Sequence, residues 1–197
     1  EFRLGHGNVI DITIQGAKVI LEDHGQGFIP NSFRDDGKTI LEAAFSVLNT
    51  SGKYREDGTY EGTSLGSFGI GSKITTFLSH WLEVMTYRDG KYEHLWFKEG
   101  VFDKRDTGKW QNSTTGTLVQ WEPSEEFFTH PEVDINVIKN LLKTTACLCP
   151  GLTINLDDNG TKTTYQSVRG LHDLVDAAVK DKELINNRFI VHWQENK

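Results

Sequence analysis

The spacing of apolar side chains predicts a chain of β-hairpins interrupted by helices. Apolar residues alternate with polar ones over residues 9–21, and a turn at Gln15-Gly16 divides this stretch into the two strands of a hairpin. Apolar residues then recur at helical spacing over residues 40–48, which predicts a helix that is stopped by Ser51-Gly52.

Further hairpins and helices are predicted along the rest of the chain. They are a helix over 72–81 after Gly71, a hairpin over 82–100 turning at Asp89-Gly90, a strand over 116–124, a helix over 135–148, a hairpin over 152–167 turning at Asn159-Gly160, a helix over 170–181 and a strand over 187–194. Because hairpins are mixed with helices and do not alternate regularly with them, we expect an α+β fold, with helices on one face of an antiparallel or mixed sheet.

Length and composition indicate a single soluble domain over residues 1–197. Hydrophobic residues make up 37% and charged residues 25% of the chain, without a repeat or an interior linker. No apolar run reaches the length of a membrane span and no leader peptide opens the chain, so we expect no membrane contact. A net charge of −7 without a basic block argues against a stand-alone nucleic-acid binder. Cys147 and Cys149 have apolar neighbours, which favours core cysteines in a reducing cytoplasm.

Candidate chemistry lies in a glycine-rich stretch, SLGSFGIGSK, over residues 64–73. Its glycines Gly66, Gly69 and Gly71 follow the spacing G-x-x-G-x-G, and Lys73 comes two places later. A glycine-rich loop that runs into a helix lets the backbone approach phosphate groups and presents free N–H groups to them. The spacing matches neither a P-loop nor a dinucleotide-binding fingerprint. On its own, the stretch is also compatible with a flexible surface loop.

A second glycine motif, DHGQG, follows the first predicted hairpin and contains Asp23, Gly25 and Gly27. The order D-x-G-x-G, helix, polar loop, G-x-x-G-x-G resembles the ATPase superfamily of gyrase B subunits, heat-shock chaperones, histidine kinases and MutL. Segments similar to the gyrase B and topoisomerase IV ATPase domain follow in the same order along nearly the whole chain: ILEAAFSVLNTSGKY, GTYEGTSLGSFGIGSKITTFLS, LEVMTYRDGK, GTLVQWEPSEEFFT, LLKTTACLCPGLTINLDD and VRGLHDLV. This resemblance implies a two-layer α/β sandwich with a mixed sheet.

The resemblance implies roles in adenine recognition for four residues. Asp23 would accept a hydrogen bond from the adenine amino group of ATP, and Thr117 would hold a water molecule between the two. Gly25 and Gly27 would let the chain pass close under the base. Without the resemblance, Asp23 would be interpreted as a surface turn residue and Thr117 as an ordinary strand threonine.

The same resemblance implies a lid over the triphosphate of ATP. The residues that match this lid are Gly66, Gly69 and Gly71, together with Lys53 and Tyr60, which would approach the nucleotide. Lys73 is similar to the lysine of the G-x-x-G-x-G-A-K form in eukaryotic type II topoisomerases, where it neighbours phosphate. Taken alone, Lys53 would be an ordinary solvated lysine.

Two functional residues of the family have no counterpart in this sequence: the glutamate that activates water and the asparagine that holds Mg²⁺. Both lie on a helix before the first hairpin, and Glu1 matches the last acidic residue of that helix. Glu183 and Asn187 repeat the i,i+4 spacing, but their surroundings match an ordinary helix-to-strand passage of the family. We therefore expect the chain alone to bind nucleotide weakly and not to hydrolyse it, with Mg²⁺ bound in the intact enzyme.

Two arginines of the family are also replaced. Gln26 stands inside the first glycine motif, and Gln120 stands three places after Thr117. In the family, the arginine at the second of these positions grips aminocoumarin antibiotics, which compete for the nucleotide pocket. A neutral amide loses the charge-assisted hydrogen bonds of a guanidinium, so we expect aminocoumarins to bind poorly.

Together these likenesses imply the ATP-binding domain of a bacterial or phage type IIA DNA topoisomerase subunit, similar to gyrase B and located in the cytoplasm. In such an enzyme ATP binding closes a dimeric gate and hydrolysis reopens it, which drives DNA strand passage. The implied partners are ATP, an A-type topoisomerase subunit, a second copy of the chain and, only through other domains, DNA.

Two alternatives stay open. One is a truncated or degenerate nucleotide-binding module that does not hydrolyse ATP. The other is an ATPase of the histidine-kinase or chaperone kind, against which the strand GTLVQWEPS and the helix–strand unit LLKTTACLCPGLTINL both argue.

Overall fold

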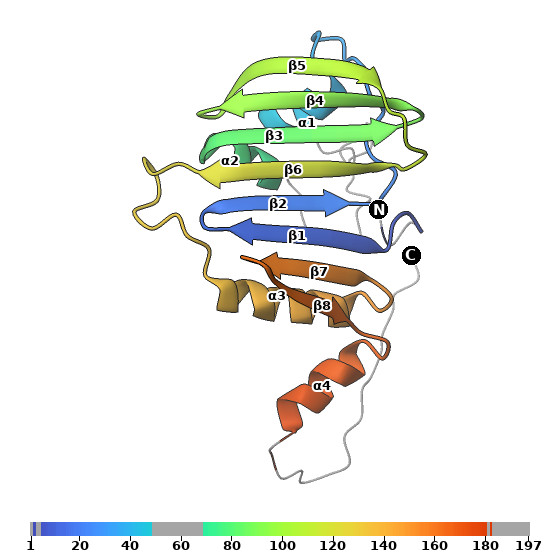
Figure 1. Ribbon diagram of the computed structural model, residues 1–197, viewed down its shortest axis with the longest axis vertical. Coiled ribbons are helices and arrows are strands. Elements are labelled where there is room, and N and C mark those ends of the chain that lie inside the picture. The colour runs from blue at the N-terminus through green and yellow to red at the C-terminus, as the bar shows by residue number, and fades with distance from the viewer. Residues whose placement is uncertain (1, 3–4, 49–68, 181, 183–197) are drawn as a thin grey trace, which may run out of the picture.

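The structure is a computed structural model that describes residues 2, 5–48, 69–180 and 182 of the chain. Within these ranges the chain forms eight strands and four helices (Figure 1). The strands are β1 (Val9–Gln15), β2 (Lys18–Asp23), β3 (Ser79–Arg88), β4 (Lys91–Lys98), β5 (Val101–Lys109), β6 (Gly116–Pro123), β7 (Thr153–Asp158) and β8 (Thr161–Gln166), and the helices are α1 (Ile40–Ser46), α2 (Gly71–Phe77), α3 (Ile135–Leu148) and α4 (Leu171–Val179).

The eight strands belong to one mixed sheet, in the order β5-β4-β3-β6-β2-β1-β7-β8. Neighbouring strands are antiparallel except β1 and β7, which run parallel. Helices α1, α2 and α3 lie on the same side of the sheet, behind it in Figure 1, while α4 packs against α3. The predicted α+β fold, with helices on one face of a mixed sheet, is confirmed. None of the helices in the described ranges is both long and apolar enough to span a membrane.

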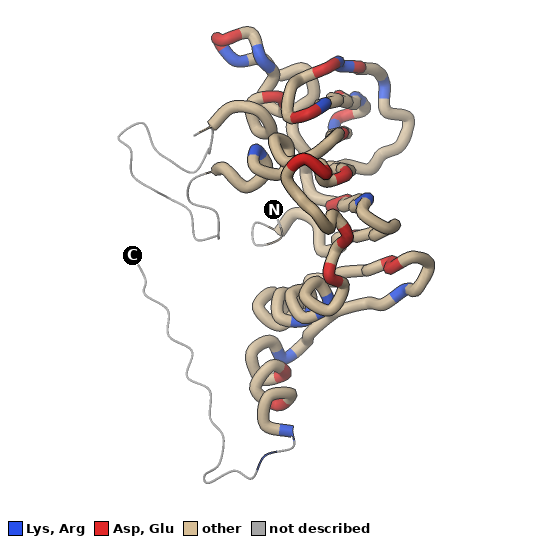
Figure 2. The backbone as a smooth tube through the Cα atoms, turned by 90° about the vertical axis from the view of Figure 1, so that its left-hand side faces the viewer, with Lys and Arg blue, Asp and Glu red and all other residues tan. Residues whose placement is uncertain are grey.

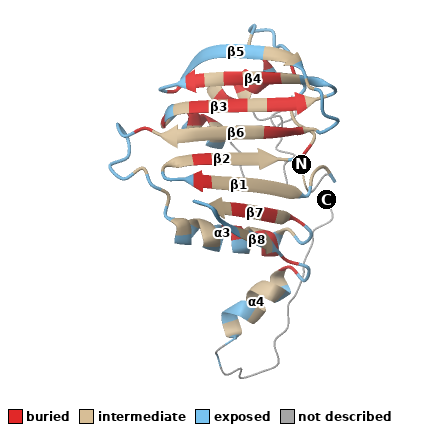
Figure 3. Ribbon diagram, in the orientation of Figure 1, coloured by how far each residue is buried: buried red, intermediate tan, exposed pale blue. Residues whose placement is uncertain are grey.

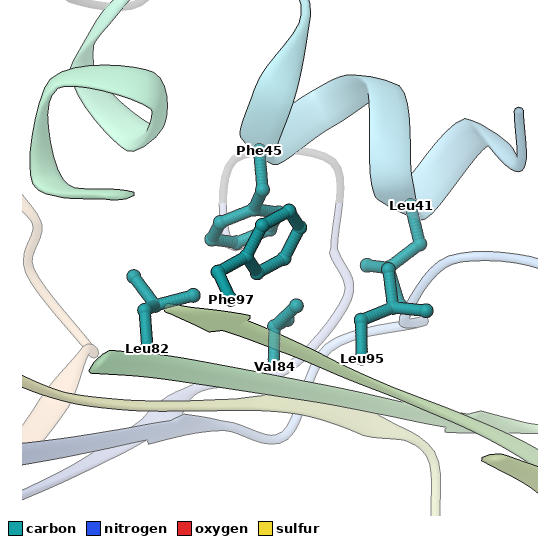
Figure 4. Packing of buried hydrophobic residues seen from close by; sticks show 6 residues of the cluster. All are labelled: Leu41, Phe45, Leu82, Val84, Leu95 and Phe97. Atoms are coloured by element: carbon teal, nitrogen blue, oxygen red, sulfur yellow. The ribbon is translucent and has the colours of Figure 1, made fainter. Parts of the chain in front are cut away.

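Two apolar clusters hold the helices against the sheet. In the first, two side chains of α1 point toward four side chains of β3 and β4 (Figure 4): Leu41, Phe45, Leu82, Val84, Leu95 and Phe97. In the second, α3 packs on β1 and β7 through a group of buried residues: Ile14, Leu142, Leu152, Ile154 and Leu156. Among the strands, buried residues are concentrated in β3, β4 and β7 (Figure 3). The helix-covered side of the sheet is therefore the interior of the domain.

Local sequence explains several element boundaries. The β3–β4 turn contains Asp89 and Gly90 with φ angles of 52° and 69°, the left-handed geometry that a two-residue hairpin turn needs. The same geometry recurs at the predicted turn between β7 and β8. Helix α3 begins after Asp134, whose carboxylate accepts hydrogen bonds from two N–H groups of the first turn. The two turns and the start of α3 therefore lie where the sequence predicts them.

Three elements differ from their predictions. Helix α1 ends at Ser46, and α2 ends at Phe77 although a helix is predicted to continue to residue 81. The segment Ser79–Trp81 instead begins β3, because it pairs with the end of β6. Strand β5 is not predicted at all, since it is an exposed, charged edge strand without apolar alternation. At the start of β3 and in β5, pairing between distant parts of the chain outweighs the local pattern.

Some predictions fall outside the described residues. They concern the helix stop at Ser51-Gly52, the strand over 187–194 and the pair Glu183 and Asn187. Cys147 and Cys149 are both free thiols in the structure; Cys147 is buried as predicted, whereas Cys149 is only partly buried.

Candidate functional site

Asp23 and Thr117, which are far apart in the sequence, are cross-strand neighbours in the structure. Asp23 is the last residue of β2 and pairs with Thr117 of β6, which in turn pairs with Thr86 of β3. Thr86 pairs with Glu93 of β4. Directly opposed residues of antiparallel strands project to the same face, so these four residues form one line, which we call the polar row.

The polar row lies on the helix-covered face of the sheet. Thr86 follows the buried core residue Val84 by two positions, and side chains two positions apart on a strand share a face. Thr117 is 7% exposed, whereas Thr86 and Glu93 are fully buried. Asp23 is half-buried, and its Oδ1 accepts a hydrogen bond of 2.9 Å from the N–H of Gly25. The row therefore places a carboxylate and a hydroxyl together at the border of the apolar core.

Gly27 allows the chain to pass very close to the sheet after Asp23. Its φ is +67°, and a Cβ atom there would lie 2.6 Å from the carbonyl oxygen of Gly116 and 2.8 Å from Oγ1 of Thr86. Gly116 is equally confined, because a Cβ atom on it would lie 2.2 Å from the carbonyl oxygen of Asp23. These glycines have a packing role that the motif did not reveal. A role of Gly25 and Gly27 beneath adenine stays a prediction.

The second glycine motif is described only in part. Gly69 has a φ of +60°, and Gly71 begins α2, which is seven residues long and has no side-chain cap at its start. Ser72 donates a hydrogen bond of 2.6 Å to the carbonyl oxygen of Ala44, which ties α2 to α1. The predicted lid residues Lys53, Tyr60 and Gly66 lie outside the described residues.

Lys73 of α2 is a buried cation. The residue is only 3% exposed, and no acidic partner is found for it among the residues that the structure describes. Burial away from water disfavours the charged amine and lowers the pKa of Lys73 from its ordinary value. An anionic group placed beside this amine would counter that cost.

The structure corrects the prediction for Gln120. Thr117 and Gln120 are three positions apart on β6, so their side chains project to opposite faces of the sheet. Nε2 of Gln120 donates a hydrogen bond of 2.8 Å to Oε2 of Glu83 on the outer face. The expectation that Gln120 lines the nucleotide pocket, and with it the reason given for poor aminocoumarin binding, is therefore wrong.

A different cation lies at the rim of the polar row. Arg88 ends β3, and its Nη1 donates to Oε1 of Gln26 at 3.4 Å and to the carbonyl oxygen of Gly27 at 3.5 Å. Nε2 of Gln26 in turn lies 2.6 Å from Nε2 of His6. Gln26 therefore links Arg88 to the N-terminal loop.

Two hollows on the described surface lie away from the polar row. One, of about 300 Å³, is on the outer face of β1, β7 and β8 and includes Asp11, Asn155 and Lys162. The other, of about 460 Å³, is bordered by His80, Glu99 and several further acidic residues. Lys and Arg are interspersed with Asp and Glu along the chain (Figure 2). Across the described ranges, no group of three or more His, Cys, Asp or Glu side chains is arranged to hold a metal ion.

Comparison with known proteins identifies the type of domain. No family model matches the chain. It is 32% identical over 190 residues to the B subunit of DNA topoisomerase 4 from Staphylococcus aureus strain MW2, and equally to the proteins of strains Mu50 and COL. The alignment covers 93% of this chain and 28% of each relative, so the chain spans less than a third of their length.

A solved structure shows the same fold. The 43K ATPase domain of Thermus thermophilus gyrase B, crystallised in complex with an aminocoumarin, superposes with a TM-score of 0.79 at 21% identity. The match covers 100% of this chain and 50% of that chain. The sequence relatives and this common fold agree: the chain is homologous to the B subunits of DNA topoisomerase 4 and has the fold of the gyrase B ATPase domain.

Proposed function

We propose that this domain binds an adenine nucleotide over the Asp23–Thr117 end of the polar row. The observation that carries the proposal is the cross-strand pairing of Asp23 with Thr117 on the helix-covered face. Adenine presents an exocyclic N–H donor, for which a carboxylate is a strong acceptor. A threonine hydroxyl both donates and accepts, so Thr117 suits a bridging water molecule between the base and Asp23.

The orientation of the Asp23 carboxylate supports this role. Its Oδ1 accepts the N–H of Gly25, which keeps the side chain turned along the loop that follows β2. The carbonyl oxygen of Gly25 accepts a hydrogen bond of 2.6 Å from the hydroxyl of Thr115 beside β6. Such fixed neighbours reduce the side-chain entropy that nucleotide binding would otherwise cost.

Lys73 is the described residue best suited to meet the phosphate groups. Its buried amine lacks a carboxylate partner among the described residues, and a phosphate would offset the cost of burying it. Helix α2 is too short for a strong dipole, so the side chain and the backbone near Gly69 and Gly71 would contribute more than the helix end. By resemblance, Gly66, Lys53 and Tyr60 would complete the lid.

The function of the intact protein is proposed on the basis of its relatives. The domain would belong to a cytoplasmic type IIA topoisomerase B-like subunit, which works with an A-type subunit and contacts DNA through other domains. ATP binding would close a dimeric gate, and hydrolysis would reopen it. The described residues offer no cluster of ligands for Mg²⁺, so the proposal places the nucleotide, and not the metal, on them.

Calorimetry with a non-hydrolysable ATP analogue tests the assignment of the adenine site. Asp23→Asn keeps the size of the side chain but removes the charged acceptor, so binding should weaken by about 1.5–3 kcal/mol, the range for hydrogen bonds to charged groups. Asp35→Asn, which makes the same change at an exposed loop position, serves as the matched control. Equal affinities of Asp23→Asn and wild type would refute the assignment.

A phosphate-release assay separates nucleotide binding from hydrolysis. Binding without turnover would favour a non-hydrolysing module for the chain on its own. Steady turnover would show that the chain contains a general base, and Glu183→Ala would then test whether the residue near the C-terminus supplies it.

A further inference from the structure

The loop that follows Asp23 crosses three strands on the helix-covered face. This crossing segment, residues 25–31, leaves the end of β2 and passes over the adjoining ends of β6, β3 and β4. Thr115, next to β6, binds the carbonyl oxygen of Gly25. Thr86 of β3 and Glu93 of β4 then accept hydrogen bonds from the backbone of the segment. The crossing segment is therefore fastened at each strand that it passes.

Thr86 joins the crossing segment to β3 and β6. Its Oγ1 accepts the N–H of Phe28 at 2.8 Å. The same hydroxyl is within donating distance of two carbonyl oxygens, that of Gly116 at 3.2 Å and that of Phe28 at 3.3 Å. Gly116 immediately precedes Thr117 on β6, so one fully buried hydroxyl connects β3, the crossing segment and the strand that carries half of the proposed adenine site.

Glu93 fastens the far end of the crossing segment at a cost in stability. Its Oε2 accepts the N–H of Asn31 at 2.8 Å, while its fully buried Oε1 has no hydrogen-bond partner among the residues that the structure describes. Burying a carboxylate that has so few partners is unfavourable for folding. Burial of Glu93 lowers the stability of the fold, and yet its side chain holds this backbone. The role of Glu93 is therefore better explained as positioning the crossing segment than as stabilising the fold.

The distance between the crossing segment and the sheet also affects the orientation of the Asp23 carboxylate. Gly27 already packs so closely on Gly116 and Thr86 that a Cβ atom would not fit. The N–H of Gly25 is the donor that orients the Asp23 carboxylate. A shift of the segment away from the sheet would therefore move the partner of Asp23 as well.

We propose that Thr86 and Glu93 are positioning residues for the nucleotide site. They hold the crossing segment at the height at which Gly25 orients Asp23 toward Thr117, and neither of them touches the nucleotide. This inference rests on the proposed function, because it assigns the two residues a role in the same adenine site.

Substitutions of Thr86 test whether nucleotide affinity depends on its hydroxyl group. Thr86→Val has nearly the same shape but can neither accept the N–H of Phe28 nor donate to a carbonyl oxygen, so affinity for a non-hydrolysable ATP analogue should fall by at least about three- to tenfold, the range for one neutral hydrogen bond. Thr86→Ser keeps the hydroxyl and should bind within about twofold of wild type. Thr164→Val, which removes an outer-face hydroxyl bonded to Asn155, is the matched control and should leave the affinity unchanged.

Substitutions of Glu93 distinguish a positioning role, which would affect nucleotide affinity, from a role in the stability of the fold. Glu93→Gln keeps an acceptor for the N–H of Asn31 and should preserve the affinity for the nucleotide. Glu93→Met removes both the acceptor and the buried charge, so its melting temperature should equal or exceed that of wild type while its affinity falls by about three- to tenfold. A residue with only a structural role would lower affinity and stability together. If Thr86→Val does not fold, the Glu93 pair decides the question.

Amide hydrogen exchange without nucleotide tests the fastening itself. The amide of Phe28 should exchange at least about tenfold faster in Thr86→Val, and that of Asn31 likewise in Glu93→Met, while core amides of β3 stay protected. Unchanged exchange at both amides would overturn the inference, and so would faster exchange combined with wild-type affinity. A wild-type chain that binds no nucleotide would refute the proposed function and the positioning role together, while exchange would still report whether the segment is fastened.

Discussion

The two faces of the sheet use similar residues differently at the same strand ends. On the outer face, the hydroxyl of Tyr87 donates a hydrogen bond of 2.6 Å to Oε1 of Glu22, and Trp110 stacks on the Tyr87 ring at 4.6 Å. On the helix-covered face, Asp23 and Thr86 instead bind backbone groups of the crossing segment. The outer groups satisfy one another and brace the sheet, whereas the inner groups hold a loop in place over the strand ends.

The comparison shows how strictly strand alternation assigns a role. Glu22 and Asp23 are consecutive, yet one carboxylate lies on the bracing face and the other in the proposed site. Thr117 and Gln120 are divided between the faces in the same way. Separation along the chain therefore does not predict which residues belong to the proposed site, whereas the register of the strands does.

The largest effect on stability is expected from adding a side chain to Gly27, where the crossing segment packs closely on the sheet. Gly27→Ala places a Cβ atom 2.6 Å from a backbone oxygen at a left-handed φ, which should lower the free energy of unfolding by about 2–5 kcal/mol. Gly16→Ala is the matched control, because Gly16 has a similar φ of +62° with no atom within 4 Å, and should cost only about 1–2 kcal/mol. Urea unfolding of both variants measures the difference, and equal costs would contradict the close approach.

Replacing the buried cation should separate binding from stability. Lys73→Met removes a charge-assisted contact to phosphate, and nucleotide affinity should fall roughly ten- to hundredfold by calorimetry. Folding should not suffer, because the amine is buried without an acidic partner among the described residues. Undiminished affinity would remove Lys73 from the proposed phosphate contacts.

The pH dependence of stability gives an independent check on Lys73. Burial lowers its pKa below the ordinary 10.5, so between the lowered pKa and 10.5 the unfolded chain binds more protons than the folded one. Wild-type stability should therefore gain from this group as the pH rises through that window, and Lys73→Met should lack the gain. Chemical denaturation of both proteins across alkaline pH measures the difference between them.

A smaller effect is expected on the outer face. Tyr87→Phe breaks the hydrogen bond to Glu22 and should cost about 1–2 kcal/mol of stability. Burial, together with the Glu22 carboxylate, raises the pKa of Tyr87, so the hydroxyl stays protonated and donates throughout the neutral range. Nucleotide affinity should stay within about twofold of wild type, because the bracing pair faces away from the site. A large loss of affinity would show that the two faces are coupled.

The smallest effect is expected from Gln120→Arg. Its side chain lies on the outer face beside Glu83, so neither nucleotide nor aminocoumarin affinity should change by more than about twofold. A marked gain in aminocoumarin affinity, measured by calorimetry, would mean that β6 has a different register in solution.

Much of the architecture could be predicted from local sequence. The hairpin turns at Asp89-Gly90 and Asn159-Gly160 lie where they are predicted and the helix over 135–148 has its predicted bounds, because turn glycines, a capping aspartate and helical periodicity act within a few residues. Strand β5 and the start of β3 escaped prediction, because only pairing with distant strands makes those segments extended.

The proposed site could be predicted only as a set of motifs. The pairing of Asp23 with Thr117 agrees with the roles that the resemblance implied, although the nucleotide itself stays a prediction. Thr86 and Glu93 carry no motif, since their importance comes from a loop that crosses their strands. The residue before a turn can be recognised locally, whereas the residue beneath a crossing loop cannot.

The sequence by itself determined the turns, the amphipathic helix and the two glycine motifs of this protein, because these depend on backbone preferences and spacing within short segments. Only the tertiary structure decided which face of the sheet is covered, and so which polar residues meet over the strand ends. Thr117 and Gln120 show the reason: alternation puts them on opposite sides, but helix packing on one side alone makes that side the interior.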